Sequence, residues 1–258
     1  MEKRKLATVV LIIGLVLLVA GASMLVLDYQ KKDRADRQNE RLQELATEKS
    51  SEETKSNQDN ETIAESSGAY VSPIQFDALK AINPDIVGWL KIEGTSIDYP
   101  IVQTDNNETY LDIDFEGKKN ASGAIFLDYE SEPDFSGRHN ILYGHHMKNG
   151  SMFKDIIKYK EESFFKDHQD ITIYTPEREI HLRPFTVLYT DADGERRRTK
   201  FDTEEVFNGY VEKMTKKGLF YQKPDEPIGT LWSFVTCSYE LADARTILYA
   251  YEVSQVEK

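Results

Sequence analysis

The chain has 258 residues, of which 32 are Lys or Arg and 45 are Asp or Glu, giving a formal net charge of −13. This acidic excess argues against binding to nucleic acid and against adhesion to anionic lipid, because both carry the same sign of charge. The chain holds one cysteine, which excludes an internal disulfide framework.

An uncharged run of 22 residues, rich in Leu, Val and Ile, extends from Leu6 to Leu27. At about 1.5 Å per helical residue it is long enough to cross a hydrocarbon core about 30 Å thick. A cleaved signal peptide is the alternative, since Ala20–Ala22 resembles a cleavage site, but the apolar run continues beyond it. We therefore predict a cytoplasmic tip and transmembrane anchor over residues 1–27, with the rest of the chain outside the cell.

A polar stalk is predicted over residues 28–69, which are dense in Glu, Lys, Arg, Gln, Asn and Ser. Residues 31–49 have charges at helical neighbour spacing and could form a solvated helix. Residues 50–68 carry too little apolar surface to order themselves. The stalk is expected to hold the following domain away from the bilayer.

Residues 70–258 are enough for one substantial core, and they form the predicted globular domain. Short apolar or alternating runs, separated by Gly, Pro, Asn and Asp, predict a mainly β fold. A closed or nearly closed barrel of eight strands with peripheral helices is expected. The predicted strands are Val87–Ile92, Ile97–Val102, Gly123–Leu127, Asn140–Tyr143, Ile171–Tyr174, Ile180–Tyr189, Thr230–Val235 and Thr246–Tyr251, and the predicted helices are Ile74–Ile82, Ser151–Phe165 and Thr203–Lys216.

The single cysteine, Cys237, is a candidate nucleophile at the end of an apolar strand. A lone thiol outside the cytosol cannot form an internal disulfide and risks oxidation where it is exposed. Nucleophilic catalysis is one reason to retain it, and a small buried hydrophobe is the alternative.

Cysteine chemistry on an amide needs a proton donor for the leaving amine, and histidine is the usual choice. His145 and His146 follow a predicted strand at the point where the chain turns, where scaffolds often present reactive groups. By position alone the two are equivalent. His168 and His181 are expected to be structural or solvated, and His139 begins a strand.

Arg245 is a candidate for stabilising developing negative charge, because a guanidinium offers a rigid fork of donors. It opens an apolar strand that is expected to pair with the strand of Cys237 through a short connection. The alternative is a solvated ion pair with Asp243 or Glu240.

Taken together, these residues resemble the sortases, and class B sortases in particular, over nearly all of residues 70–258. The resemblance implies an eight-stranded sortase-type β-barrel behind an N-terminal anchor and stalk. A helical insertion at 202–217 is also typical of class B. The motifs that carry the resemblance are Asn83–Ile92, Ile97–Gln103, Gly123–Asp128, Tyr143–Phe153 and Thr236–Glu240 followed by Arg245.

The resemblance also implies roles for individual residues. The Tyr-Gly-His motif places the catalytic histidine at His145, with Cys237 as nucleophile and Arg245 as stabiliser of the oxyanion or substrate carbonyl. Three further residues would line the groove for the sorting signal: Asn107, Leu111 and Tyr143. The family pattern Thr-Leu-x-Thr-Cys reads Ser-Phe-Val-Thr-Cys here, and Val235 stands where class B members often have Ser.

The activity that the resemblance implies is transpeptidation through a cysteine thioester, at the cell membrane and without a metal or cofactor. The substrates would be exported proteins with a C-terminal sorting motif of the Asn-Pro-x-Thr type. The acceptor would be an amine of the membrane-bound peptidoglycan precursor, lipid II, or alternatively a pilin lysine.

Two other classes of protein remain as alternatives. A papain-like cysteine protease would hydrolyse its thioester, but such enzymes place Cys before His, whereas His145 precedes Cys237 here. A membrane-tethered binding domain would carry an inert cysteine, which would resist thiol-reactive probes in the folded state.

Overall fold

The computed structural model describes residues 13–24, 37–47, 70–191, 194–237 and 244–254. The chain divides into two compact units, Met1–Arg41 and Leu42–Lys258. In the first unit, residues 13–24 form an α-helix. Among the described residues, no helix combines the length and apolar character needed to cross a membrane. The predicted anchor extends beyond the described helix at both ends, and much of the predicted stalk also lies outside the described residues.

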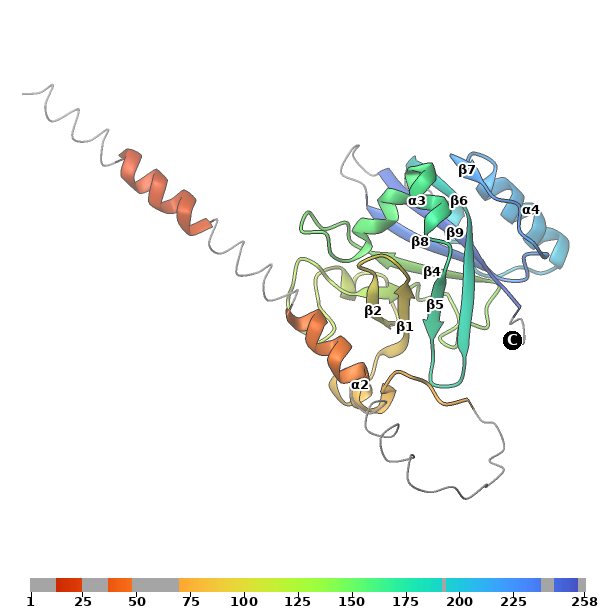
Figure 1. The fold of residues 1–258 in the computed structure, drawn as a ribbon, viewed down its shortest axis with the longest axis horizontal. Helices are drawn as coiled ribbons and strands as arrows, with labels where there is room; N and C mark the ends of the chain where they lie inside the picture. The colour runs from red at the N-terminus through yellow and green to blue at the C-terminus, as the bar shows by residue number, and fades with distance from the viewer. Residues whose placement is uncertain (1–12, 25–36, 48–69, 192–193, 238–243, 255–258) are drawn as a thin grey trace, which may run out of the picture. The chain divides into compact units, whose positions relative to one another are not determined.

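Eight strands of the second unit close into a β-barrel, as predicted (Figure 1). Their order around the barrel is β5-β1-β2-β3-β4-β8-β9-β6, and a β5–β6 pairing closes the ring. A two-residue strand, β7, is attached to β6 and was not predicted. The strands are β1 (Ile86–Ile92), β2 (Asp98–Val102), β3 (Ile125–Leu127), β4 (His139–Gly144), β5 (Ile171–Tyr174), β6 (Glu179–Asp191), β7 (Phe220–Tyr221), β8 (Leu231–Cys237) and β9 (Ala244–Glu252).

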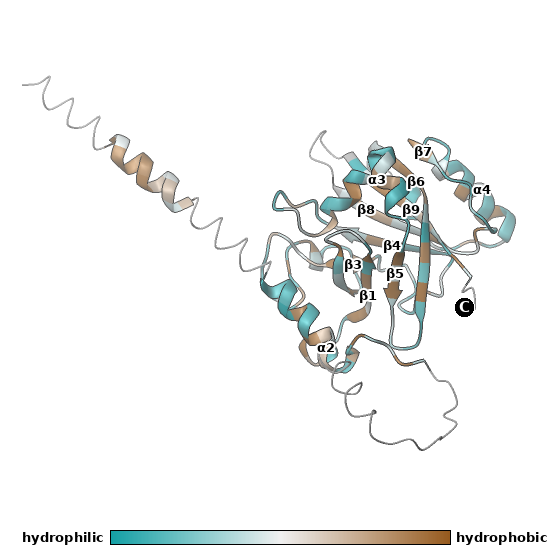
Figure 2. Cartoon of the chain, in the orientation of Figure 1, coloured by the Kyte–Doolittle hydropathy of each residue, from teal (hydrophilic) through white to brown (hydrophobic). Residues whose placement is uncertain are grey.

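The barrel interior is filled by side chains that alternate along the strands. In β5, Ile171 and Ile173 are buried while Thr172 and Tyr174 are partly exposed, which is the period of a strand with one face inside. From β8, Trp232 and Phe234 contribute the bulkiest interior groups. Hydrophobic residues accordingly dominate β1 and β5, whereas the helices also carry hydrophilic ones (Figure 2).

Three α-helices and three 3₁₀-helices lie around the barrel in the described part of residues 70–254. Two of the predicted helices appear within a few residues of their expected bounds. The elements are α2 (Phe76–Ile82), α3 (Glu162–Asp167), α4 (Glu204–Thr215), η1 (Thr109–Leu111), η2 (Phe153–Lys160) and η3 (Gly194–Arg197).

The segment predicted as one helix over Ser151–Phe165 is instead divided in two. Its first part, η2, is a 3₁₀-helix whose Phe153, Ile156 and Tyr159 are buried. A spacing of three residues matches the three-residue turn of a 3₁₀-helix, so these side chains all reach the core. Glu161 then adopts an extended backbone and separates η2 from α3.

Helix α4 forms for reasons that are visible in its sequence. The Thr203 side chain accepts a hydrogen bond from the Val206 backbone amide, which caps the helix N-terminus. Its buried residues recur at helical spacing on one face: Phe207, Tyr210, Val211 and Met214. This face lies in one hydrophobic cluster with residues of β6, β8 and β9, and it contacts β6 directly.

Residues 37–47 form a helix whose end belongs to the barrel unit. Leu42 and Ala46 are buried together with Ile74 and Phe76, and Trp89 of β1 lies in the same cluster. The Gln43 side-chain amide also donates to the Asp98 carbonyl over 3.0 Å. This part of the predicted solvated helix therefore contributes to a core.

Candidate active site

Three neighbouring strands begin or end at the same edge of the barrel (Figure 1). β4 and β8 run parallel, and Gly144 at the end of β4 pairs with Thr236. β9 runs antiparallel to β8, and its Arg245 pairs with Cys237. The backbone therefore places His145, which directly follows Gly144, at the level of Cys237 and Arg245.

Gly144 is required by close packing immediately before His145. A Cβ atom at this position would lie 2.5 Å from Ile125 Cδ1 and 2.7 Å from Phe153 Cγ. Any larger residue would push the strand end away from the core. The glycine of the Tyr-Gly-His motif thus sets the position of the histidine through contact with the barrel interior.

His145 is held in place by one side-chain and one backbone hydrogen bond. Its Nε2 lies 2.7 Å from the Leu111 carbonyl oxygen, and its own carbonyl accepts from the Phe153 amide. A carbonyl oxygen only accepts, so Nε2 carries the hydrogen. Nδ1 is then the nitrogen of His145 that can take up and release a proton.

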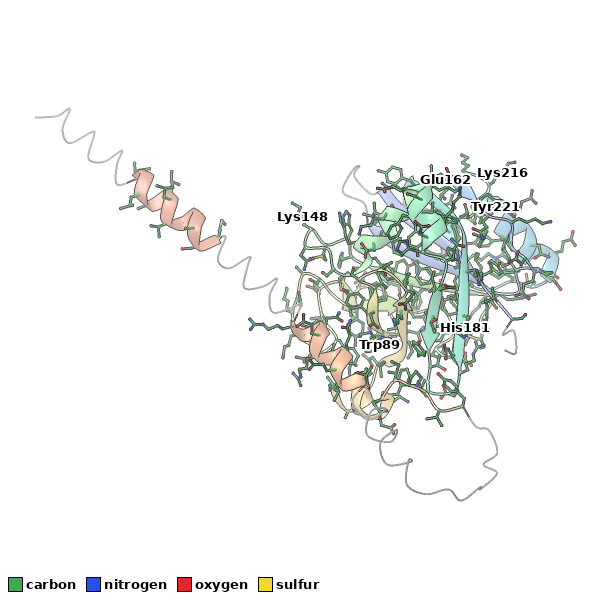
Figure 3. The ribbon with its side chains drawn as sticks, in the orientation of Figure 1. Trp89, Lys148, Glu162, His181, Lys216 and Tyr221 are labelled. Atoms are coloured by element: carbon green, nitrogen blue, oxygen red, sulfur yellow. The ribbon has the colours of Figure 1, made fainter. Side chains whose placement is uncertain are left out.

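His146 lies in a different environment. Its Nε2 accepts a hydrogen bond from the Lys154 ammonium over 2.6 Å, and its backbone bridges to Met152. Lys148 lies in the loop between His146 and Met152 and projects away from the barrel (Figure 3). With its Nε2 lone pair directed at a cation, His146 is less suited to receive a proton than His145.

The other three histidines make structural contacts. His139 is fully buried, with Nε2 2.7 Å from Ser233 Oγ and Nδ1 2.9 Å from the Arg198 carbonyl, and burial lowers its pKa to about 4. His168 stacks on Phe164 at 3.7 Å between ring centroids. His181 pairs with Glu179 on the surface of β6 (Figure 3). The prediction that His168 and His181 are structural or solvated agrees with these contacts.

Arg245 lies between two strands at this edge. It pairs with Cys237 of β8 on one side and with Thr190 of β6 on the other, and its side chain is half-buried. By strand alternation it shares the face of Ile247, which packs beneath α4. The expected pairing of the two strands is therefore present.

The departures from the family pattern before Cys237 fit the barrel. Phe234 faces the interior and packs edge-on to Phe153 with ring centroids 6.2 Å apart. Ser233 keeps a hydroxyl and uses it on His139. Val235 joins the outer cluster with α4, so an apolar side chain is accommodated there.

The three predicted groove residues are connected to His145 or to Asp128. Leu111 supplies the carbonyl to which His145 donates, and its side chain is 42% exposed, which leaves it accessible to a ligand. Asn107 and Tyr143 both donate to Asp128 Oδ2, over 2.9 Å and 2.8 Å. Burial, aided by the Asp128 carboxylate, raises the pKa of Tyr143 above its usual range, so the phenol stays protonated.

Asp128 and Arg197 are the residues that the sequence analysis missed. The Asp128 carboxylate is fully buried and forms an ion pair with Arg197 Nε over 3.2 Å. An acidic residue directly after an apolar strand is the signal that could have identified Asp128, since a buried acid needs a partner.

In the described part of the chain, no three His, Cys, Asp or Glu side chains gather as metal ligands would.

Comparison with known proteins identifies the family. A family model described as the sortase domain matches residues 90–253. The chain belongs to the sortase family. Sortase B of Staphylococcus aureus is 33% identical over 150 residues, which cover 58% of this chain and 61% of that relative. The match thus spans less than two thirds of the relative's length.

Solved structures agree with this assignment. Sortase B of Clostridium perfringens, 32% identical, superposes with a TM-score of 0.66 and covers 69% of this chain and 100% of its own. A Staphylococcus aureus sortase B–substrate complex, 27% identical, gives a TM-score of 0.72 and covers 87% of this chain and 99% of its own. The predicted class B resemblance and the barrel are both confirmed.

Proposed function

We propose that this protein is a cysteine transpeptidase that cleaves a C-terminal sorting motif of exported proteins and transfers them to a cell-wall amine. The observation that carries the proposal is the strand register. Gly144 pairs with Thr236, and Cys237 pairs with Arg245, so His145, Cys237 and Arg245 converge at one edge of the barrel.

In the first half-reaction, the Cys237 thiolate attacks the carbonyl carbon of the threonine in the motif, and a C–S bond forms. The carbonyl electron pair moves onto oxygen, where the Arg245 guanidinium stabilises it. Collapse of this intermediate breaks the C–N bond, and protonated His145 gives its proton to the departing amine. The product is a thioester on Cys237.

In the second half-reaction, an acceptor amine attacks the thioester carbonyl. The amine loses a proton to His145 Nδ1, a new amide bond forms, and the Cys237 thiolate is released. The hydrogen bond from Nε2 to the Leu111 carbonyl supports this role, because it fixes the tautomer that leaves Nδ1 as the acceptor.

The peptide chemistry of the relatives supports both substrates. One matched structure is a sortase B–substrate complex, and another, 27% identical to this chain, is sortase B complexed with triglycine. Triglycine offers a primary amine on a flexible peptide, as a peptidoglycan cross-bridge does. We therefore infer a sorting motif of the Asn-Pro-x-Thr type, bound near Asn107, Leu111 and Tyr143, and an acceptor on the cell-wall precursor.

Membrane attachment belongs to the same proposal. Residues 1–27 would anchor the chain, residues 28–69 would act as a stalk, and residues 70–258 would carry the activity outside the cell. This arrangement would concentrate the enzyme beside exported substrates and lipid-linked precursor.

The test is product partition, using the full-length protein in mild detergent, a motif peptide and a series of amines. Amide products should form with triglycine or a diamino acid, and turnover should rise with amine concentration because aminolysis of the thioester competes with hydrolysis. Mass spectrometry identifies the products, and Cys237→Ala is the inactive control.

Other outcomes would favour the alternatives. Hydrolysed acid as the sole product, with no acceleration by any amine, would favour a protease. Acceptance of only a pilin lysine would indicate a pilus-building enzyme. A Cys237 that resists thiol-reactive probes in the folded protein would indicate a binding domain.

A further inference from the structure

Asp128 places a buried carboxylate in the wall of the barrel beside the candidate site. Its side chain is fully buried, directly after β3. Oδ1 accepts the Glu130 backbone amide over 2.9 Å. Oδ2 accepts three side-chain donors: Asn107 Nδ2 at 2.9 Å, Tyr143 Oη at 2.8 Å and Arg197 Nε at 3.2 Å.

The three side-chain donors come from segments that are far apart in the sequence. Asn107 precedes η1, Tyr143 is in β4, and Arg197 ends η3 in the connection between β6 and α4. Burying a carboxylate costs free energy unless it is paired and hydrogen-bonded. Asp128 therefore fixes these three segments to one point, and each of them stabilises its charge.

Two of these segments lead directly to His145. Tyr143 is two residues before it, and Gly144 between them is packed so closely that even a Cβ atom would not fit. Residues 107–111 are held at one end by the bond from Asn107 to Asp128 and contact His145 at the other through the Leu111 carbonyl. A displacement of Asp128 would thus reach His145 along two short paths.

Arg197 ties the third segment to the same carboxylate. Its guanidinium also lies 5.8 Å from the Tyr129 ring, which is exposed beside Asn107. The Tyr129 backbone amide donates to Asn107 Oδ1, so the side chain of Asn107 is fixed at both of its polar atoms. The connection before α4 is in this way joined to the predicted peptide groove.

We propose that Asp128 is a positioning residue for acyl transfer, holding Asn107, Tyr143 and the Arg197 segment in the arrangement that binds the peptide and orients His145. This inference rests on the proposed function. Asp128 touches neither substrate nor reacting atoms and acts through its hydrogen-bond donors.

The first test is steady-state cleavage of a motif peptide by full-length Asp128→Asn, which keeps the shape of the side chain and removes its charge. A displacement of groove residues by about 1 Å can cost about 100-fold, so kcat/KM should fall roughly 10- to 100-fold. The loss should appear in both KM and kcat, because the network holds peptide-binding groups and also orients His145.

Arg197 offers a matched set of variants. Arg197→Gln should also raise KM. Arg197→Lys should bring KM most of the way back to the wild-type value, because it returns a cation to Asp128. Arg198→Gln is the control, since the Arg198 side chain donates to the Lys200 carbonyl and lies over Phe201. The double variant Asp128→Asn with Arg197→Gln should be no worse than the poorer single variant, because charge and partner are removed together.

A second measurement is independent of peptide cleavage. The ¹⁵N NMR signals of the His145 ring should shift in Asp128→Asn and in Tyr143→Phe, and stay unchanged in Arg198→Gln. Tyr143→Phe removes one donor and keeps the packing of the ring on Phe126, so it serves if Asp128→Asn does not fold.

The proposal is overturned if Asp128→Asn keeps wild-type kcat and KM, or if the His145 signals are unchanged in both variants. A wild-type protein that cleaves no motif peptide would contradict the proposed function instead. In that case, the His145 signals alone would decide whether Asp128 positions the histidine.

Discussion

At the scale of single residues, adjacent histidines differ in what their ring nitrogens face. His145 donates to a carbonyl oxygen, whereas His146 accepts from the Lys154 ammonium. A proton added to His146 would place two cations in contact, and this repulsion opposes its use as a base. By position alone the two histidines were equivalent. Their hydrogen bonds give a physical reason to prefer His145 as the acid and base.

We expect His145→Ala to lower kcat for peptide cleavage by roughly 100- to 10,000-fold, the usual contribution of a positioned acid or base. His146→Ala should cost less than about tenfold, since it removes a contact to Lys154 and no proton transfer. Steady-state kinetics with the motif peptide measure both variants. A greater loss in His146→Ala would move the catalytic role by one residue.

At the scale of elements, consecutive residues fasten the connection between β6 and α4 to the barrel. Arg196 donates to the Met214 carbonyl at 2.9 Å and to Tyr249 Oη at 3.2 Å. Arg197 pairs with Asp128, and the Arg198 carbonyl bonds to His139. Although three cations in a row would suggest a solvated surface, the backbone and two of the side chains instead anchor the segment.

The burial of His139 makes the free energy of unfolding depend on pH. Burial lowers its pKa from an ordinary 6.5 to about 4, so between these pH values the unfolded chain binds a proton that the folded chain does not. The folded state has its full stability with respect to His139 above pH 6.5, where the histidine is neutral in both states, and it loses stability as the pH falls toward 4. The loss should total roughly 3 kcal/mol, at about 1.4 kcal/mol per pH unit.

The measurement is the free energy of unfolding by urea at several pH values between 4 and 7. His139→Gln should flatten the dependence on pH relative to the wild type. Other titrating groups are the same in both proteins, so the difference between the two curves isolates the histidine. His181→Gln, a surface residue paired with Glu179, should keep the wild-type slope. Equal slopes for all three proteins would contradict this role for His139.

At the scale of the whole molecule, the sequence was most informative where one local pattern determines structure. The eight barrel strands were predictable because each has its own apolar period and turn residues. The positions of His145, Cys237 and Arg245 were predictable because they lie at strand ends. The pair Asp128–Arg197 was not, because its members are 69 positions apart in the sequence and only the closed barrel brings them together.

The packing of residues 42–47 was missed for another reason. Leu42, Leu45 and Ala46 follow helical spacing, but the surrounding charges dominate the local composition. The amphipathic face is narrow, and its partners Ile74 and Phe76 lie beyond a long polar segment. A short apolar stripe in a polar helix was therefore interpreted as solvated.

This helix should contribute to the stability of the barrel unit. Leu42 is 4% exposed and lies in the cluster of Trp89, so Leu42→Ala removes buried apolar surface and leaves a cavity. Leu→Ala changes cost about 2–5 kcal/mol in protein cores, and we expect about 2 kcal/mol at this edge of the unit. Urea unfolding followed by tryptophan fluorescence measures it.

Glu44→Ala is the matched control, because Glu44 is an exposed residue of the same helix. It should change the free energy of unfolding by less than about 0.5 kcal/mol, as surface substitutions generally do. The cluster that Leu42 joins also includes Tyr143, so Glu44→Ala is the variant that should leave peptide cleavage unchanged. If Leu42→Ala matches Glu44→Ala, the helix adds nothing to the fold, and the domain begins near residue 70 as the sequence predicts.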